Sequence, residues 1–220
     1  MTLREAQDIV QQHAPTPYYR EKYRALEDEY LPLVVDILGG LNPKRLVDVG
    51  PGWGTLAVWA RGNGTLADVV DFVDPGTFLT KELCERAHLH YHQVFLETDR
   101  HLPPLLGDVV TMTMVIGHLR YRPDNAIARA ARLLRSAGTF VCCNVDKTRC
   151  PEMLPVYSSW KDMPVPGQDV FPSDKLVTCT FDEGEYGELL ESCFAEVEVK
   201  AASDVPILTG VCRVPRCVYP

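Results

Sequence analysis

The stretch RLVDVGPGWGTLAVWA (residues 45–60) constrains the fold more than any other part of the chain. An apolar run ends at Asp48, three glycines then alternate at Gly50, Gly52 and Gly54, and a helical pattern follows at once. Glycine costs backbone entropy, so a loop with three of them serves unusual backbone angles or the close approach of a ligand. The pattern predicts a buried strand, a ligand-binding turn and a helix in direct succession.

The rest of the chain alternates in the same way between apolar or β-branched runs and amphipathic runs. Further strands are expected over residues 68–74, 92–99, 108–119, 139–145, 195–202 and 207–215. Helices are expected over residues 3–14, 20–38, 55–61, 123–138 and 181–194, with another that ends at residue 86. Strand therefore alternates with helix five times, and two strands close the chain. This order predicts an α/β domain with a mostly parallel sheet covered on both faces.

Two segments stand apart from this alternating pattern. Residues 1–40 are expected to form an N-terminal helical segment that acts as a lid, and residues 41–220 the domain itself. Within the domain, about residues 147–175 contain five prolines among aromatic and charged residues. An irregular insertion of this length often forms a lid or one wall of a substrate site.

The charge and hydropathy of the chain limit the classes of partner. The formal net charge is −8, which argues against a chain that grips nucleic-acid phosphates. No apolar run approaches the roughly 20 residues that a membrane-spanning helix needs. The first residues, MTLREAQDIV, carry charges where a signal peptide is apolar. A cytoplasmic protein is therefore expected, with neither nucleic acid nor membrane as a partner.

The cysteines and histidines offer little sign of a metal site. The eight cysteines include no C-x-x-C pair, which zinc sites generally use, so they are expected to be reduced and mostly buried. His88, His90 and His92 alternate and would share one face of a strand. Three aligned imidazoles can bind a metal ion, but a half-exposed strand start gives the same pattern. No metal site is predicted.

The glycine turn, with the pattern D-x-G-x-G-x-G, resembles the first motif of the class I S-adenosylmethionine-dependent methyltransferases. Later segments are similar to that family in the same order: VVDFVDPG, LETDRHLP, GDVVTMTMVIGHL, ARLLRSAGTFVCCNV and FDEGEYGELLESCFAEVEV. The resemblance covers about residues 45–215. It implies a Rossmann-like, doubly wound sheet of seven strands with an antiparallel last strand, and S-adenosyl-L-methionine as the cofactor, which leaves as S-adenosyl-L-homocysteine.

The resemblance also implies a set of cofactor contacts. An acidic residue that ends the second strand would hold the ribose hydroxyls, and we place Asp74 there, with Asp71 as the second candidate. An acidic residue near the adenine would be Asp99. The whole set predicted to bind the cofactor is Asp48, Gly50, Pro51, Gly52, Trp53, Gly54, Asp74, Pro75, Asp99 and Ile116. Ordinary capping of strand ends is the alternative explanation for the aspartates.

Methyl transfer mainly requires alignment and the exclusion of water, and a general base is needed only if the acceptor arrives protonated. His118, at the end of the fourth strand, is the candidate base or a pocket-lining residue. Tyr18, Tyr19 and Tyr23 are candidates for a lid over the cofactor. The residues predicted to contact the acceptor are Tyr19, His118, Tyr157 and Trp160.

The acceptor is expected to be a small molecule, with a protein or peptide as the alternative. Two other functions remain open from the sequence. One is a non-catalytic S-adenosylmethionine-binding or partner subunit. The other is an NAD(P)-dependent oxidoreductase, which Thr55 disfavours because the dinucleotide fingerprint needs a small residue at that position.

Overall fold

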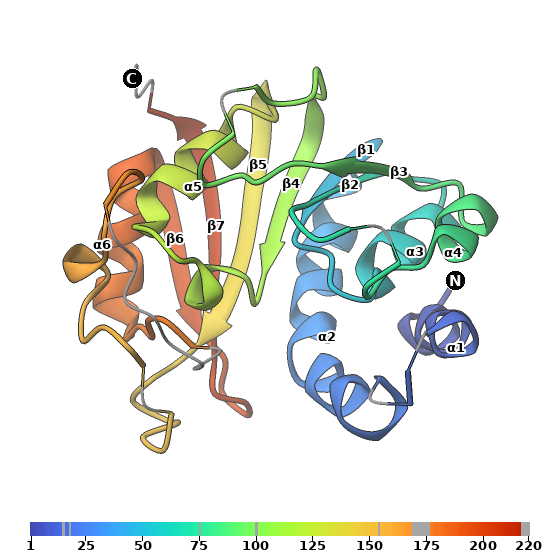
Figure 1. Cartoon of the computed structure of the whole chain (residues 1–220), viewed down its shortest axis with the longest axis horizontal. Coiled ribbons are helices and arrows are strands. Elements are labelled where there is room, and N and C mark those ends of the chain that lie inside the picture. The colour runs from blue at the N-terminus through green and yellow to red at the C-terminus, as the bar shows by residue number, and fades with distance from the viewer. Residues whose placement is uncertain are drawn as a thin grey trace.

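The computed structural model of the chain describes residues 1–14, 16–17, 19–74, 76–99, 101–153, 155–168 and 177–216. Its strands form one sheet in the order β3-β2-β1-β4-β5-β7-β6 (Figure 1). They are β1 (Arg45–Val49), β2 (Leu66–Asp71), β3 (His90–Gln93), β4 (Gly107–Thr113), β5 (Leu134–Val145), β6 (Phe194–Ala201) and β7 (Ile207–Pro215). Neighbouring strands are parallel, except that β7 is antiparallel to β5 and β6. The predicted mostly parallel sheet with an antiparallel last strand is confirmed.

Helices cover both faces of this sheet, as expected for a doubly wound fold. They are α1 (Leu3–His13), α2 (Arg24–Leu41), α3 (Thr55–Gly62), α4 (Lys81–Arg86), α5 (Pro123–Ala131) and α6 (Glu183–Cys193). Three short helical turns are η1 (Tyr19–Tyr23), η2 (Ile116–His118) and η3 (Trp160–Asp162). Figure 1 shows α5 and α6 on one side of the sheet and α1 to α4 on the other.

The apolar runs become strands that are buried on both faces, and this gives the molecule two cores. In β1, Val47 and Val49 face the core under α5 and α6, whereas Leu46 faces the core under α2 and α3. All three side chains are buried. Because side chains alternate along β1, this one strand contributes to both cores. Its packing on both faces fixes the position of the turn that follows.

The second strand ends earlier than predicted, which is a correction with consequences for the site. β2 ends at Asp71 and not at residue 74. The Asp71 side chain accepts hydrogen bonds from the backbone amides of Phe72 at 2.7 Å and Val73 at 3.4 Å. Because the carboxylate satisfies the next two amides, the backbone leaves the ladder there.

The third and fourth strands are also shorter than predicted. β3 ends at Gln93, and β4 ends at Thr113. Met114 has a φ of 57°, a left-handed conformation that few residues other than glycine adopt. This reversal ends β4, and the residues that follow form η2.

The helix expected over residues 123–138 is likewise shorter. α5 ends at Ala131, and β5 begins at Leu134, which pairs with Gly107. The amide of Gly107 donates to the carbonyl of Leu133 at 2.7 Å, so the chain re-enters the sheet directly after the helix. Pairing with β4 thus overrides the helical pattern of the sequence.

The N-terminal helices belong to the core of the fold. Ala6 and Val10 of α1 and Val34 and Leu38 of α2 are almost fully buried in the same cluster as Leu46. The lid role of residues 1–40 stays a prediction. Among the described residues, no helix has the length and apolar character needed to cross a bilayer.

Candidate functional site

A cavity of about 80 Å³ opens at the carboxyl ends of β1, β2 and β4. It is lined by residues 49–50, 70–72, 94–97, 112, 115 and 118–120. Most of these side chains are apolar, and the charged or titratable ones are Asp71, Glu97, His118 and Arg120. Ligands of parallel α/β sheets bind at this edge, near the point where the strand order reverses, which here lies between β1 and β4.

One residue of the glycine turn, Gly50, lines the cavity. Gly50, Gly52 and Gly54 have φ values of 66°, 54° and 87°, so each takes the left-handed conformation that favours glycine. A Cβ on Gly50 would lie 2.4 Å from a methyl group of Val115, and one on Gly52 would lie 2.7 Å from the Tyr23 hydroxyl oxygen. The turn therefore requires glycine both for its backbone angles and for the close packing of two neighbouring segments.

Asp48, near the end of β1, has one carboxylate oxygen that receives no hydrogen bond from the described residues. The residue is 1% exposed, and its Oδ1 accepts a hydrogen bond from Thr111 Oγ1 at 2.7 Å. Its Oδ2 is buried and has no hydrogen-bond partner among the described residues. Burial raises the pKa of Asp48 to about 7. A buried oxygen of this kind is suited to a donor or cation that a ligand brings.

Asp71 is the carboxylate that reaches the cavity. It is almost fully buried and lines the cavity from the end of β2, and burial raises its pKa to about 6. Asp74 is exposed, and its Oδ1 accepts from Gln93 Nε2 at 2.8 Å outside the cavity lining. The prediction that Asp74 ends the second strand is wrong, and Asp71 becomes the stronger candidate for that role.

The acidic residue nearest the cavity after β3 is Glu97, which the sequence interpretation missed. Glu97 is buried, and its Oε1 accepts from the backbone amide of Tyr121 at 2.7 Å. Asp99 is exposed, lies outside the cavity lining, and accepts from the amide of Phe95 at 2.7 Å as part of a local turn. The only signal in the sequence was that two acidic residues stand two positions apart.

Trp53 and Tyr19 point into the protein. Trp53 is 3% exposed. The centroid of its ring lies 5.4 Å from that of Tyr19, 5.9 Å from that of Tyr23 and 5.4 Å from that of Phe78. This aromatic cluster attaches the N-terminal segment to the glycine turn. The Trp53 ring thus packs within this cluster and does not line the cavity, and its predicted cofactor contact stays a prediction.

A buried polar cluster supports the same attachment. Tyr19 is fully buried, and its hydroxyl donates to Glu27 Oε2 at 2.7 Å, beside Thr55 Oγ1 at 3.1 Å. Thr55 Oγ1 donates to the same Glu27 oxygen at 2.9 Å. Burial raises the pKa of Glu27 to about 7. The Tyr19 hydroxyl is enclosed and already hydrogen-bonded in this structure, and its predicted acceptor contact stays a prediction.

His118 lies on η2 with an exposed side chain and lines the cavity. Its backbone amide donates to the carbonyl of Val115 at 2.9 Å, which closes the turn. Ile116, two residues before His118, has a fully buried side chain, so only its backbone can face a ligand. The structure therefore brings Gly50, Asp71 and His118 together at the cavity, with Asp48 buried two residues before Gly50.

The insertion places its aromatic residues away from the cavity. Trp160 is 5% exposed, with the Arg122 guanidinium 5.2 Å and the Lys161 ammonium 5.6 Å from its ring centroid. Tyr157 is partly buried, and neither ring lines the cavity. The Trp160 ring packs inside the protein, and its predicted acceptor contact stays a prediction. Pro75 and Tyr18 lie outside the described residues, as does part of the insertion.

Other features of the described residues lie outside this site. His90 and His92 flank the buried carboxylate of Asp68 at 3.4 and 3.5 Å. Within the described ranges, no group of three or more histidine, cysteine or acidic residues is placed to hold a metal ion. The seven described cysteines are free thiols, and six of them are buried.

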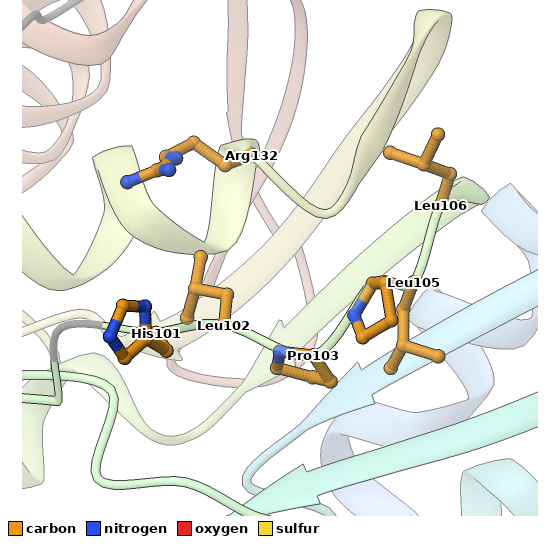
Figure 2. A pocket seen from close by; sticks show the side chains of 7 residues that line it. His101, Leu102, Pro103, Leu105, Leu106 and Arg132 are labelled. Carbon is orange, nitrogen blue, oxygen red and sulfur yellow. The ribbon is translucent and has the colours of Figure 1, made fainter.

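A second hollow is lined by residues 101–106 and Arg132. Figure 2 shows Arg132 at the end of a helix, across from the loop that carries His101 and Leu102. None of the residues predicted for the cofactor or the acceptor lines this hollow. It is therefore separate from the candidate site.

The sheet order, the glycine turn after β1 and the carboxylates at the ends of β1 and β2 define the Rossmann-like fold of the class I methyltransferases. The sequence profile of a methyltransferase-domain family matches residues 19–192, and the chain belongs to this family. The curated ubiquinone biosynthesis O-methyltransferase of Nitrosomonas europaea is 30% identical over 105 residues, which are 47% of this chain and 44% of that protein. The match thus spans less than half of the curated relative.

Solved structures share the fold. The S-adenosylmethionine-dependent methyltransferase SibL in its apo form has a TM-score of 0.62 and 17% identity, over 88% of this chain and 57% of that chain. The 1,6-didemethyltoxoflavin-N1-methyltransferase of Burkholderia thailandensis, with bound 1,6-didemethyltoxoflavin and S-adenosylhomocysteine, has a TM-score of 0.61 and 16% identity. That alignment covers 97% of this chain and 91% of the other. At these identities the likeness shows the architecture alone.

Proposed function

We propose that this protein transfers a methyl group from S-adenosylmethionine to a small-molecule acceptor and releases S-adenosylhomocysteine. The observation that carries the proposal is the arrangement of carboxylates around the glycine turn. Asp48 offers a buried oxygen without a partner on one side, and Asp71 lines the cavity on the other. Membership of the methyltransferase family supports the same function.

The residues of the site fit this cofactor. Asp48 Oδ2 suits the ammonium of its methionine end, because both its buried position and its charge favour a cationic donor. The glycine turn lets backbone groups approach that end without interference from Cβ atoms. Asp71 suits the two ribose hydroxyls, since a carboxylate accepts several hydrogen bonds at once. Glu97 lies on the adenine side of the same cavity.

The cavity must widen to accept such a ligand. Its volume of about 80 Å³ is well below the roughly 300 Å³ of ordinary ligand pockets. Val115 and Tyr23 are the side chains that crowd the glycine turn, one from the loop after β4 and one from the N-terminal segment. We therefore propose that the N-terminal segment acts as the predicted lid, with Tyr23 as the residue that touches the turn.

When bound, S-adenosylmethionine supplies a methyl group activated by a sulfonium. The work of the protein is then to align the acceptor and to exclude water. His118 is proposed to take the proton from an acceptor hydroxyl or amine, since its imidazole lies exposed at the cavity rim and an imidazole nitrogen can accept a proton. The proposed acceptor is a small molecule, with a protein or peptide as the alternative, and a cytoplasmic location stays a prediction.

Titration calorimetry and a turnover assay test the proposal. We expect S-adenosylhomocysteine to bind and NAD⁺ not to bind, and we expect a panel of phenols, carboxylic acids, amines and thiols to contain an acceptor. Binding of NAD⁺ in place of the nucleoside would support the oxidoreductase alternative. Tight binding of S-adenosylhomocysteine with no turnover across the panel, including peptides, would support the non-catalytic subunit.

A further inference from the structure

The turn that carries His118 is held by a segment far away in the sequence. The backbone amide of Thr178 donates to the carbonyl oxygen of Gly117 at 2.7 Å, and its hydroxyl Oγ1 donates to the same oxygen at 2.8 Å. Both donors thus converge on the residue immediately before His118. The sequence separation of 61 residues makes this a tertiary contact and not a local turn.

A second contact holds the other end of the same loop. The amide of Arg122 donates to the carbonyl of Pro164 at 2.9 Å, and the Arg122 guanidinium lies over the ring of Trp160. The amide of Tyr157 in turn donates to the carbonyl of Thr178 at 2.9 Å. The insertion therefore holds the Arg122 end of this loop, and through Tyr157 it is connected to Thr178, which holds the Gly117 end.

Gly117 is packed so tightly that its position depends on these neighbours. A Cβ at Gly117 would lie 3.0 Å from the carbonyl oxygen of Cys179 and 3.2 Å from Asn144 Oδ1. The backbone of the turn thus rests directly on the segment after Thr178 and on the end of β5. A small shift of this segment would be passed on to His118, because close-packed interiors have little free space to absorb it.

We propose that Thr178 is a positioning residue, whose hydroxyl fixes the Gly117 carbonyl and so connects the insertion to the orientation of His118. This inference rests on the proposed function, in which His118 faces the acceptor. The insertion is connected to Thr178 through the Tyr157 amide, so the Thr178 hydroxyl joins the insertion to the turn that carries His118. Thr178 itself does not line that cavity.

Substitution at Thr178 distinguishes the contribution of its hydroxyl from that of its backbone amide. Thr178→Val keeps the shape and the amide donor but removes the Oγ1 donor, and Thr178→Ser restores it. Thr209→Val is the matched control, because Thr209 also donates its hydroxyl to a backbone carbonyl, that of Lys200 at 3.2 Å, on the distant β6–β7 pair. Both valine variants lose one hydrogen bond of about 1 kcal/mol.

The first measurement is amide hydrogen exchange at His118, whose amide closes the turn. Loss of about 1 kcal/mol corresponds to roughly fivefold faster exchange. We expect that increase in Thr178→Val, a return to wild-type exchange in Thr178→Ser, and no change at this amide in Thr209→Val. Unchanged exchange in Thr178→Val, or equal increases in both valine variants, would overturn the proposal.

The second measurement is turnover of an acceptor found in the panel. We expect kcat to fall at least fivefold in Thr178→Val and to recover in Thr178→Ser, while the affinity for S-adenosylhomocysteine changes less than twofold. A loosened turn with unchanged kcat would show that the contact is merely structural and would reject the positioning role. If the wild-type protein methylates nothing, the proposed function fails, and hydrogen exchange alone decides whether the contact holds the turn.

Discussion

Substitution of Asp71 by asparagine is the sharpest test of how this site recognises a ligand. Asp71 lines the cavity, is 8% exposed, and uses its Oδ1 to accept from the amides of Phe72 and Val73. Asparagine keeps an amide oxygen for that local cap but loses the charge and one acceptor. Asp71→Asn therefore perturbs ligand recognition more than it perturbs the end of β2.

The size of the effect follows from the kind of hydrogen bond. A hydrogen bond to a charged group contributes about 1.5–3 kcal/mol, and a neutral one about 0.5–1.5 kcal/mol. Replacing the carboxylate by an amide should therefore cost about 1–2 kcal/mol, or roughly 5- to 30-fold in affinity for S-adenosylhomocysteine. Asp71→Ala should lose more affinity and also stability, because two backbone amides lose their acceptor.

The raised pKa of Asp71 adds a pH dependence to the same experiment. Only the ionised carboxylate accepts from both ribose hydroxyls, and burial raises its pKa to about 6. The affinity of the wild type should therefore rise as the pH increases through about 6 and level off above 7. Asp71→Asn should lose the part of this dependence centred near pH 6, since an amide does not titrate, whereas the part that Asp48 contributes near pH 7 should remain.

Titration calorimetry of four proteins decides the matter: the wild type, Asp71→Asn, Asp71→Ala and Asp74→Ala. Asp74→Ala is the matched control, because Asp74 is exposed and bonded to Gln93 outside the cavity, and its affinity should stay within twofold of the wild type. The 2′-deoxy analogue of S-adenosylhomocysteine should bind the wild type more weakly than S-adenosylhomocysteine does. Asp71→Ala should bind the analogue and the parent ligand with similar affinities. A greater loss in Asp74→Ala than in Asp71→Asn would refute the assignment.

Three further predictions concern the glycine turn, its support and the candidate base. Gly52→Val should lower cofactor affinity at least tenfold and also lower the melting temperature, because a Cβ there meets the Tyr23 hydroxyl at 2.7 Å; unchanged calorimetric affinity would contradict the turn's role. Glu27 has its pKa raised from 4.5 to about 7, so its contribution to stability is fully present below pH 4.5 and is lost as the pH rises through 7. Glu27→Gln should therefore remove about 3 kcal/mol of that pH dependence in denaturant unfolding, and identical pH profiles would exclude it. His118→Ala should reduce kcat at least tenfold with S-adenosylhomocysteine affinity within threefold, whereas His101→Ala, in the separate hollow, should leave both unchanged.

The fold was accessible from the sequence because its strongest signals are local. Three glycines at alternate positions are needed where φ is positive, and the structure gives all three such angles. The runs around Val47 and Val110 are mostly apolar or β-branched, as expected of strands buried on both faces. Because these patterns are local, they predict the strands and the turn without any information about contacts between distant residues.

The end of the second strand was less accessible. In VVDFVD, apolar and acidic residues follow one another in a pattern that continues past Asp71, so the sequence offers no reason to stop there. The stop comes from the Asp71 carboxylate capping its own following amides and from the partner strand, whose last paired residue, Gln93, lies opposite Asp71. Tertiary pairing and a side-chain cap thus decide which of two aspartates reaches the cavity.

The aromatic residues could not be assigned from the sequence for a similar reason. Tyr19 is buried because Glu27 and Thr55, 8 and 36 residues away, enclose its hydroxyl. Trp160 is buried because Arg122 and Lys161 cover its ring. An aromatic residue in an irregular segment is equally suited to packing and to ligand contact, and only its neighbours in space distinguish the two roles.

The charges around the glycine turn favour a cation over a neutral ligand. Asp48 and Asp71 take part in none of the ion pairs between described residues, and burial raises the pKa of each. Their ionised forms are thus costly until a positive group arrives, and a cationic ligand competes with protons for the same oxygens. Under the proposed function, the ammonium at the methionine end of the cofactor is that positive group at Asp48, and S-adenosylhomocysteine carries the same ammonium. Both forms of the cofactor should therefore compete with protons at this carboxylate, and the affinity for each should fall as the pH is lowered through about 7.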